Sequence, residues 1–231
     1  MSIYNREQQY ISLLSQGQHT VSQLSEKLFV SEPTVRRDIV KLEQKGLLEC
    51  KRGVVKLVTN AADKRIPLFI RDTEQTEAKA SIAVKAAAHI KDGFVIMMDA
   101  STTAYHLIPH LASFKDILLI TNGAKTALDA ASMGIRTICT GGEMTLESFS
   151  YIGTDAEALL SKYNADIAIF SCRGISDDGI VSDNSILENS MRRIMMKNSR
   201  KSILLSDSSK FGSKYLNTLC HKDELDELIS E

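Results

Sequence analysis

Short apolar runs alternate with helical stretches between residues 79 and 206, and this alternation limits the possible folds more than any other feature. The apolar runs, which predict strands, cover residues 94–99, 117–121, 136–140, 167–171 and 201–206. The predicted helices cover residues 79–88, 103–111, 124–132, 156–162 and 187–198. Strands that are separated by helices need crossover connections, which favour parallel pairing and helices on both faces of one sheet. The sequence therefore predicts an α/β domain with a mostly parallel sheet.

The first sixty residues carry a different pattern, in which two short helices follow one another. Thr20 and Gln23 form a capping box that opens the first helix. Residues 29–31 predict a tight turn, and Ser31 suits the N-cap of the second helix, which Gly46 ends. The apolar stripes of the two helices consist of Val21, Leu24 and Leu28, and of Val35, Ile39 and Leu42.

The second of these helices presents polar side chains away from its apolar stripe. At about 100° per residue, Arg37 points opposite that stripe. The side chains beside it and on its flank are Thr34, Arg36 and Lys41. Arginine can donate to both O6 and N7 of guanine, while threonine and lysine reach phosphate or a thymine methyl group. This pattern is typical of a recognition helix that enters the major groove.

A basic hairpin is expected directly after the recognition helix. Two β-prone runs, residues 47–52 and 54–58, flank Gly53, and Lys51 and Arg52 lie beside the tip. Such a wing contacts the DNA backbone or the minor groove. The predicted DNA-binding residues are Thr20, Ser31, Thr34, Arg36, Arg37, Lys41, Lys51 and Arg52. The alternative is a small helical protein-interaction module with solvated arginines; we favour DNA binding because cap, turn, stripe and wing agree.

Charge and composition exclude several other classes of protein. The net charge is −1, but residues 1–58 carry +3 and the remainder −4. No apolar stretch approaches the length of a membrane span, and the polar start lacks the core of a signal peptide, so we expect a cytoplasmic protein without membrane association. Four scattered cysteines without a C-x-x-C pair, and His106 and His110 without a third ligand, predict neither disulfides nor a metal site.

Polar residues gather where the predicted strands end. The segments are residues 99–103, 121–123, 140–142, 172–174 and 207–210. Ligands of open α/β sheets bind outside the carboxyl ends of the strands, so we expect these segments to form one pocket. The hydroxyl groups and helix-start amides at residues 101–103 suit phosphate. The cations that offset its charge are Arg173, Arg192 and Lys210.

The other members of these segments have less specific chemistry. Asp99 cannot hold phosphate directly, and we expect it to accept from sugar hydroxyl groups or to brace its loop. Taken singly, each segment is also consistent with a helix cap or a plain turn. No Gly-x-Gly-x-x-Gly or Walker-type loop is present, and we expect no cofactor.

The segment Val30-Ser-Glu-Pro-Thr-Val-Arg-Arg-Asp38, followed by Leu42-Glu and Gly46-Leu-Leu, resembles the signature of DeoR-type transcriptional regulators. That signature is specific among winged helix-turn-helix proteins. The resemblance implies double-stranded operator DNA as a partner. The sequence departs from the family at the wing, where Lys51-Arg52-Gly53-Val54 replaces the usual Arg-x-His-Gly-Gly.

The rest of the chain, to about Gly212, is similar to the sensor domain of the same family, which resembles ribose 5-phosphate isomerase. The family's Asp-x-Gly-Thr-Thr loop matches Asp99-Ala-Ser-Thr-Thr103, with Ser101 in place of glycine, and Arg192 replaces lysine in the Glu-x-x-x-Lys-Arg stretch. The resemblance implies a phosphorylated sugar or related metabolite as effector. The predicted effector-binding residues are Asp99, Ser101, Thr102, Thr103, Thr121, Asn122, Gly141, Gly142, Arg173, Gly174, Glu188, Arg192, Asp207 and Lys210.

A sugar-phosphate isomerase-like enzyme fused to a DNA-binding module is the alternative function. Isomerisation needs a base over a C–H bond and an acid at the carbonyl oxygen. Residues 171–174 lack the carboxylates that related isomerases carry at the matching strand end. Glu188 is a lone candidate base and Cys172 a candidate nucleophile, but neither has a neighbouring histidine in the sequence. We therefore favour a binding pocket without catalysis.

These patterns predict a winged helix-turn-helix domain over residues 1–58, a linker over residues 59–76 and an effector-binding domain over residues 77–231. A homodimer or higher homo-oligomer would place two recognition helices about 34 Å apart, one turn of DNA. The family resemblance favours repression of carbohydrate-metabolism genes that the effector releases.

Overall fold

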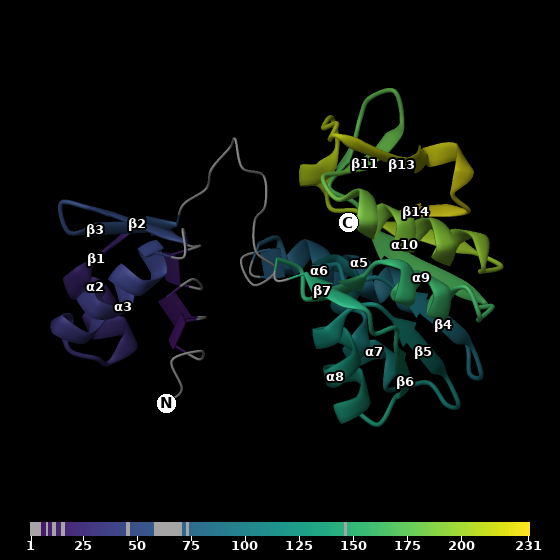
Figure 1. The fold of residues 1–231 in the computed structure, drawn as a ribbon, viewed down its shortest axis with the longest axis horizontal. Helices are drawn as coiled ribbons and strands as arrows, with labels where there is room; N and C mark the ends of the chain where they lie inside the picture. Colours follow the sequence, from purple (N-terminus) through teal and green to yellow (C-terminus); the bar gives the residue numbers. More distant parts are fainter. Residues whose placement is uncertain are drawn as a thin grey trace. The chain divides into compact units, whose positions relative to one another are not determined.

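The computed structural model describes residues 6–7, 9–10, 13–14, 17–44, 47–57, 71–72, 74–145 and 147–231. The chain divides into two compact units, residues 1–74 and 75–231 (Figure 1). The linker expected over residues 59–76 lies mostly outside the described residues, and its last residue, Thr76, already begins helix α5 (Thr76–Ala87). Among the described residues, no helix is both long and apolar enough to cross a bilayer.

Two helices of the first unit, α2 (Val21–Leu28) and α3 (Glu32–Gln44), confirm the predicted pair. The capping box of α2 is present: the Gln23 amide donates to Thr20 Oγ1 at 3.2 Å, and the Thr20 amide donates to Gln23 Oε1 at 2.8 Å. Phe29 ends α2 in the left-handed conformation, with φ of 53°. The end of the second helix that we expected at Gly46 lies outside the described residues.

The wing is the antiparallel pair β2 (Leu48–Lys51) and β3 (Val54–Leu57). Arg52 and Gly53 join them with φ of 52° and 78°. A two-residue loop with both φ values positive matches the twist of a hairpin. Strand β1 (His19–Thr20) adds to the other edge of β3. The sequence did not predict β1, because two residues carry no hydrophobic period.

The core of the first unit contains the predicted apolar stripes and one charged residue. Asp38 is 8% exposed, and its Oδ2 accepts from Arg6 Nε at 3.2 Å and from the Tyr10 hydroxyl at 3.5 Å. Burial raises the pKa of Tyr10 above its ordinary value, and the nearby Asp38 charge adds to the effect. These contacts hold Arg6 and Tyr10 against α3.

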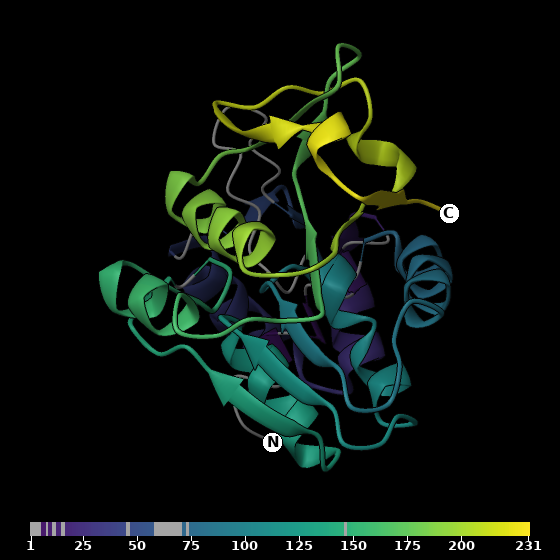
Figure 2. The ribbon, with the colours of Figure 1, turned by 90° about the vertical axis from the view of Figure 1, so that its right-hand side faces the viewer.

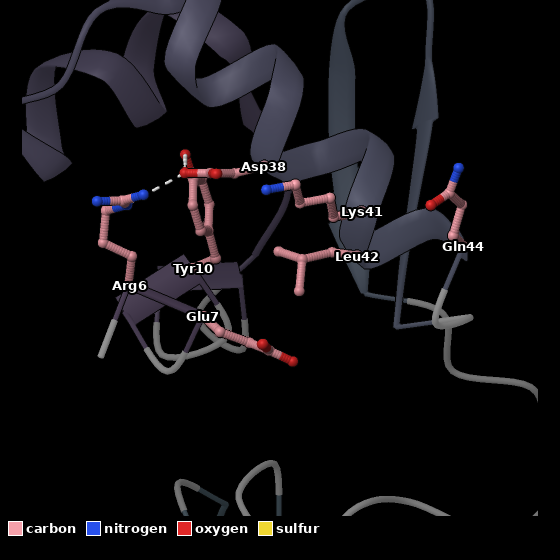
Figure 3. Close-up of a pocket in the computed structure, with 7 residues that line it drawn as sticks. All are labelled: Arg6, Glu7, Tyr10, Asp38, Lys41, Leu42 and Gln44. Atoms are coloured by element: carbon pink, nitrogen blue, oxygen red, sulfur yellow. Dashed lines mark hydrogen bonds and ion pairs between the residues drawn. The ribbon is translucent and has the colours of Figure 1, made fainter. Parts of the chain in front are cut away.

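A cavity of about 300 Å³ lies beside this ion pair (Figure 3). Its lining residues are Arg6, Glu7, Tyr10, Asp38, Lys41, Leu42 and Gln44. The cavity is therefore formed within the first unit, by Arg6, Glu7 and Tyr10 together with α3.

The second unit is built on a six-stranded sheet whose neighbouring strands all run parallel. In spatial order the strands are β14 (Glu227–Ile229), β12 (Ser202–Leu205), β9 (Ile167–Ser171), β4 (Val95–Met98), β5 (Leu118–Thr121) and β6 (Arg136–Cys139). This sheet confirms the predicted fold class and five of its strands. The edge strand β14 was not predicted.

Helices cover both faces of the sheet, as predicted. Alternate strand residues enter two separate cores: Ile96 and Met98 of β4 pack on one side and Met97 on the other. The first core also contains side chains of α5, α6 (Thr102–Tyr105), α7 (Ile108–Leu111) and α8 (Ala124–Ser132). The second contains side chains of α9 (Thr154–Leu160) and α10 (Ile186–Lys197). Figure 2 shows α10 and α5 on opposite sides of the strands.

The structure differs from the sequence prediction in its shorter elements. The helix expected over residues 103–111 is divided into α6 and α7, and Pro109 stands in the first turn of α7, where its missing N–H group costs nothing. A hairpin of β7 (Glu143–Thr145) and β8 (Ser150–Ile152) was not predicted. The same is true of a small antiparallel sheet of β10 (Gly174–Ile175), β11 (Ile180–Asp183) and β13 (Asn217–His221).

Candidate functional site

The predicted recognition helix α3 presents its cations to solvent. Arg36, Arg37 and Lys41 are exposed, whereas Val35 and Ile39 of the same helix are buried. Arg36 Nη2 lies 3.4 Å from Glu32 Oε2 in an exposed ion pair, a contact that is weak in water. Within the described part of the chain, Arg37 has no ion-pair partner, so its guanidinium group is available to a ligand.

The predicted hydroxyl contacts to DNA are already engaged in local hydrogen bonds. Ser31 Oγ lies 2.9 Å from Thr34 Oγ1 at the start of α3, and the Thr20 hydroxyl caps α2. These groups therefore order the starts of the two helices. Thr34 is half-buried, whereas Thr20 and Ser31 are exposed.

The wing places two more cations at its exposed tip. Lys51 and Arg52 are both exposed, and Arg52 occupies the turn itself. Lys51 forms an ion pair with Glu49, whose other oxygen lies 3.1 Å from Lys56 Nζ. These two lysines hold the pKa of Glu49 below its usual value. Arg52 is therefore the wing cation that is not committed to Glu49.

In the second unit, the polar segments after β4, β9 and β12 meet at the carboxyl edge of the sheet. The Ser171 amide donates to Asp99 Oδ2 at 3.4 Å, which connects the ends of β9 and β4. Lys210 Nζ donates to Thr103 Oγ1 at 3.1 Å and to Ser171 Oγ at 2.7 Å. Because Lys210 follows β12, one ammonium group bridges three adjacent strand ends.

Asp99 braces its own loop, which is one of the two roles expected for it. Its Oδ1 accepts from the Ser101 amide at 3.1 Å and from Ser101 Oγ at 2.5 Å. Ser101 in turn caps α6, because its Oγ accepts from the Ala104 amide at 3.3 Å. The serine that replaces the family's glycine thus joins Asp99 to the helix start.

Arg192 is not an available cation, which corrects the role expected for it. Its side chain is 6% exposed, and it contacts Asp99 Oδ2 at 2.9 Å, Asp183 Oδ2 at 2.8 Å and Glu188 Oε2 at 3.4 Å. Burial alone would lower the pKa of Arg192, but the three carboxylates outweigh it and raise the pKa. Arg192 therefore holds carboxylates of β11, α10 and the β4 loop together.

Asp183, at the end of β11, belongs to this cluster and was missed in the sequence. Burial would raise the pKa of Asp183, but the charges of Arg192 and Arg173 outweigh burial and hold the pKa below its usual value. Arg173 Nε lies 3.7 Å from Asp183 Oδ1, and the Arg173 side chain is 20% exposed. Of the three predicted cations, Arg173 is held by the longest contact.

Lys210 is held more firmly than Arg173. It lies 3.3 Å from Asp207 Oδ2 in addition to its two hydroxyl partners. Burial would raise the pKa of Asp207, but Lys210 and a hydrogen bond from Ser209 lower it, with a further contribution from Lys79. Lys79 of α5 is only 3% exposed. It is a cation of this edge that sequence reasoning missed, because a lysine on a helix is normally at the surface.

The segments after β5 and β6 lie beside each other at the same edge. The Thr140 amide donates to Thr121 O at 3.0 Å, and Thr121 Oγ1 accepts from the Gly123 amide at 3.0 Å. Gly141 and Gly142 both have positive φ, 63° and 105°. A Cβ atom on Gly142 would lie 2.8 Å from Ile152 O, so glycine permits a close approach to β8 there.

A close approach also explains Gly174, which lies in β10. A Cβ atom on this residue would lie 2.5 Å from Ser213 O. Gly174 therefore has a packing role against the 212–216 segment.

Glu188 and Cys172 do not have the properties of a catalytic base and nucleophile. Glu188 Oε1 accepts from Ser148 Oγ at 2.5 Å and from Ser150 Oγ at 2.9 Å, and Glu188 Oε2 faces Arg192. Burial raises the pKa of the Cys172 thiol to about 11, so it is protonated at neutral pH. Among the described residues, no group of three His, Cys, Asp or Glu side chains is placed to hold a metal ion.

Two family models together match most of the chain. Residues 6–61 match the DeoR-like helix-turn-helix domain, and residues 74–231 match the DeoR C terminal sensor domain. HTH-type transcriptional regulator GolR of Listeria innocua is 31% identical over 236 residues, covering 99% of this chain and 90% of that protein. The L-fucose operon activator of Escherichia coli is 31% identical over 221 residues, covering 95% and 90%. These relatives are named as regulators of transcription, not as enzymes.

Solved structures give similarity of fold alone. Translation initiation factor eIF-2B of Pyrococcus horikoshii has a TM-score of 0.51 at 15% identity, covering 99% of this chain and 88% of that chain. Ribose 5-phosphate isomerase of Methanocaldococcus jannaschii has a TM-score of 0.45 at 18% identity, covering 60% and 55%; this likeness supports no conclusion about function. The two domain matches and the full-length relatives show that the chain belongs to the DeoR family of transcriptional regulators.

Proposed function

We propose that this regulator represses genes of carbohydrate metabolism, and that a phosphorylated sugar in the second unit changes its affinity for operator DNA. The observation that carries the proposal is the single hydrogen-bonded network of Asp99, Ser171, Arg192 and Lys210, which joins the strand ends of one sheet edge. A relative named L-fucose operon activator supports a sugar-related role. That relative is named an activator, and we propose repression from the resemblance of the sequence to DeoR-type regulators.

The proposed division of the chain assigns DNA binding to residues 1–58, a linker to residues 59–76 and effector binding to residues 77–231. Arg37 is the base-reading side chain, with Arg36, Lys41, Lys51 and Arg52 on the phosphates. Thr20, Ser31 and Thr34 order the two helix starts that approach the duplex. This assignment rests on exposure and on the absence, among the described residues, of an ion-pair partner for Arg37.

The proposed effector site has a supporting frame and a contact layer. Asp99, Glu188, Arg192 and Asp207 form the frame, because their charges are paired with one another or with Lys210. Arg173, Lys210 and the hydroxyl groups of residues 101–103 form the contact layer for phosphate. Arg173 is the principal cation, since its contact with Asp183 is long at 3.7 Å and its side chain is 20% exposed.

Two copies of the chain in one assembly would read two half-sites of an operator. The effector would then act only to the extent that it binds one arrangement of the DNA-reading units more tightly than the other. The proposed role implies a cytoplasmic location, because operator DNA lies there in a cell without a nucleus.

A thermal-shift screen of the full chain against sugar phosphates tests the sensor assignment. A ligand that binds only the folded state adds about 2.7 kcal/mol to the unfolding free energy at a concentration of 100 times Kd, and therefore raises the melting temperature. We expect at least one sugar phosphate to do so, and Arg173→Met to reduce the shift. Lys214→Met is the matched control, because Lys214 is an exposed cation paired with Asp178 away from the network. A panel in which no sugar phosphate shifts the wild-type melting curve removes the sensor assignment.

A further inference from the structure

Val40 is an apolar side chain on the exposed part of the recognition helix α3. It is 52% exposed. Valine is also a weaker helix former than most residues, because its branched side chain loses rotamer freedom in a helix. Neither burial nor helix propensity therefore explains a valine at this position. A lone exposed valine is ordinary on most protein surfaces, so the surroundings of Val40 decide its role.

The nearest neighbours of Val40 on the helix surface are the two arginines assigned to DNA. At about 100° per residue, Val40 lies about 60° from Arg37 and about 40° from Arg36 around the helix axis, and between the two. Both arginines are exposed. Residues three and four positions apart on a helix have Cβ atoms about 5–6 Å apart. Val40 is therefore part of the same surface as the two cations.

The first unit covers α3 on both sides of this surface. On one side Asp38 accepts from Arg6 Nε at 3.2 Å (Figure 3). On the other side the Cys50 amide of the wing strand β2 donates to Glu43 Oε1 at 2.7 Å. Val40 lies on the arc of the helix between these two contacts. This arc is the part of α3 that is open to a ligand.

The chemistry of the open arc favours one partner. In the major groove, the apolar group that the base edges present is the methyl group of thymine. A protein partner that covered Val40 would have to remove water from Arg36 and Arg37, whereas DNA supplies phosphates and base acceptors for both. An apolar side chain between two exposed arginines therefore suits a thymine in a DNA duplex.

The position of Val40 along the helix matches the spacing of base pairs. Val40 follows Arg37 by three residues, an advance of about 4.5 Å along the helix axis. Successive base pairs are about 3.4 Å apart. When α3 lies along the groove with Arg37 on one base pair, Val40 reaches the next one. The stiff χ1 angle of valine keeps the loss of side-chain entropy in such a contact small.

We propose that Val40 contacts the methyl group of a thymine, at the base pair next to the one that Arg37 contacts, and so determines part of the operator sequence. This inference rests on the proposed role of α3 in reading DNA. The contact makes no hydrogen bond. It distinguishes thymine from a base without the methyl group by the burial of apolar surface.

The test removes the methyl group from the DNA and the side chain from the protein. Duplexes enriched by the full chain from a random pool provide the site, and each thymine in it is replaced in turn by deoxyuridine, which lacks only the methyl group. We expect wild type to bind about fourfold more weakly when one particular thymine of a half-site is replaced, the equivalent of one buried methyl group. Val40→Ala should bind the thymine duplex with a similar loss, and should lose no more when deoxyuridine stands at that position.

Two controls separate this effect from a change in the fold. Val84 of α5 in the second unit is also an exposed helical valine, at 59%, so Val84→Ala should bind every duplex as wild type does. Alanine is a stronger helix former than valine, so Val40→Ala should melt at or above the temperature of wild type. Fluorescence anisotropy measures binding, and circular dichroism measures melting.

Three results would count against the inference. If deoxyuridine weakened the binding of wild type and Val40→Ala by the same factor, another side chain would contact the methyl group, and the inference would be overturned. Wild-type binding that no deoxyuridine substitution changes would also overturn it. Failure of the full chain to enrich any duplex is a different result, which removes the role of α3 in reading DNA and this inference with it.

Discussion

Phe29 combines two properties that are unfavourable for an aromatic residue. It has φ of 53°, in the left-handed region, and its side chain is 94% exposed. A non-glycine residue in this region costs roughly 1 kcal/mol, and an exposed phenyl ring gains nothing from burial. The fold of the first unit therefore does not require this side chain.

We expect Phe29→Gly to raise the unfolding free energy of the first unit by about 0.5–1 kcal/mol, because glycine adopts positive φ without strain. Chemical denaturation followed by circular dichroism measures the change. Val40→Gly is a useful comparison: Val40 is also exposed but lies inside α3, so the same substitution should destabilise there. A loss of stability in Phe29→Gly would show that the phenyl group makes a contact that its exposure does not reveal.

Arg192 is the residue on which the charge balance of the sheet edge depends. It contacts Asp99, Asp183 and Glu188, and its removal leaves three carboxylates close together. We expect Arg192→Met to lower the unfolding free energy of the second unit by about 3–5 kcal/mol, as is usual when one partner of a buried ion pair is lost. Arg200→Met is the control; the Arg200 side chain is 86% exposed, so its ion pair contributes little. Similar melting temperatures for the two variants would contradict this account of Arg192.

Asp183 makes the stability of the second unit depend on pH, with lower stability at acid pH. Its pKa in the folded state lies below its usual value, so it contributes stability at neutral pH that is lost as the pH falls through the folded pKa. We expect the unfolding free energy to decrease below about pH 4, the ordinary range of an aspartate. Asp183→Asn should make that decrease less steep and lower stability at pH 7, whereas Asp177→Asn, at an exposed loop position, should leave the curve unchanged. If the unfolding free energies of Asp183→Asn and wild type decreased in the same way at acid pH, this role of Asp183 would be excluded.

At the scale of secondary-structure elements, the recognition helix and the wing have different expected effects on DNA binding. Binding sites selected from a pool of random duplexes provide the specific DNA, and a scrambled duplex the non-specific one. We expect Arg37→Ala to weaken specific binding by about 1–3 kcal/mol and non-specific binding much less, because Arg37 is assigned to a base edge.

The wing variant Arg52→Ala should weaken binding to both duplexes alike and reduce the salt dependence by about one unit of slope, because Arg52 is assigned to a phosphate. Fluorescence anisotropy at several salt concentrations measures both variants. An equal loss on both duplexes for Arg37→Ala would reassign Arg37 to the DNA backbone.

Elements with a clear hydrophobic period were predictable from the sequence. The apolar runs at residues 117–121 and 167–171 are the strands β5 and β9, and the helix of residues 124–132 is α8. The missed strands are short or have few apolar residues: β10 has two residues, and β7 is Glu-Met-Thr. Their pairing depends on contacts with distant segments, which no local pattern records.

The meeting of polar segments at one edge of the sheet was predictable from the sequence, but the contacts among their charged side chains were not. The rule that ligands bind at the carboxyl ends of parallel strands located the five polar segments. Buried charges were not predictable, because Lys79, Asp183 and Arg192 occur in stretches where a charged residue normally faces solvent. Arg192 was accordingly assigned to phosphate, whereas the structure pairs it with three carboxylates.

At the scale of the whole molecule, the chain combines a DNA-reading unit with a separate sensor unit. The two units have their own cores, and their formal net charges differ in sign: residues 1–58 carry +3 and the remainder −4. The cationic unit is attracted to DNA, whereas the acidic unit is not. Under the proposed function, regulation passes between units that fold around different cores, and it is measured as a change in DNA affinity.

The affinity of the full chain for its selected duplex, measured with and without a sugar phosphate that raises its melting temperature, tests this account most directly. Coupling free energies between two sites are typically 1–3 kcal/mol, so we expect the ligand to change the dissociation constant by about 5- to 150-fold. Arg173→Met should lose the response to ligand while it keeps the affinity of the ligand-free protein for DNA. A sugar phosphate that binds the second unit tightly and leaves the DNA affinity unchanged would contradict the account.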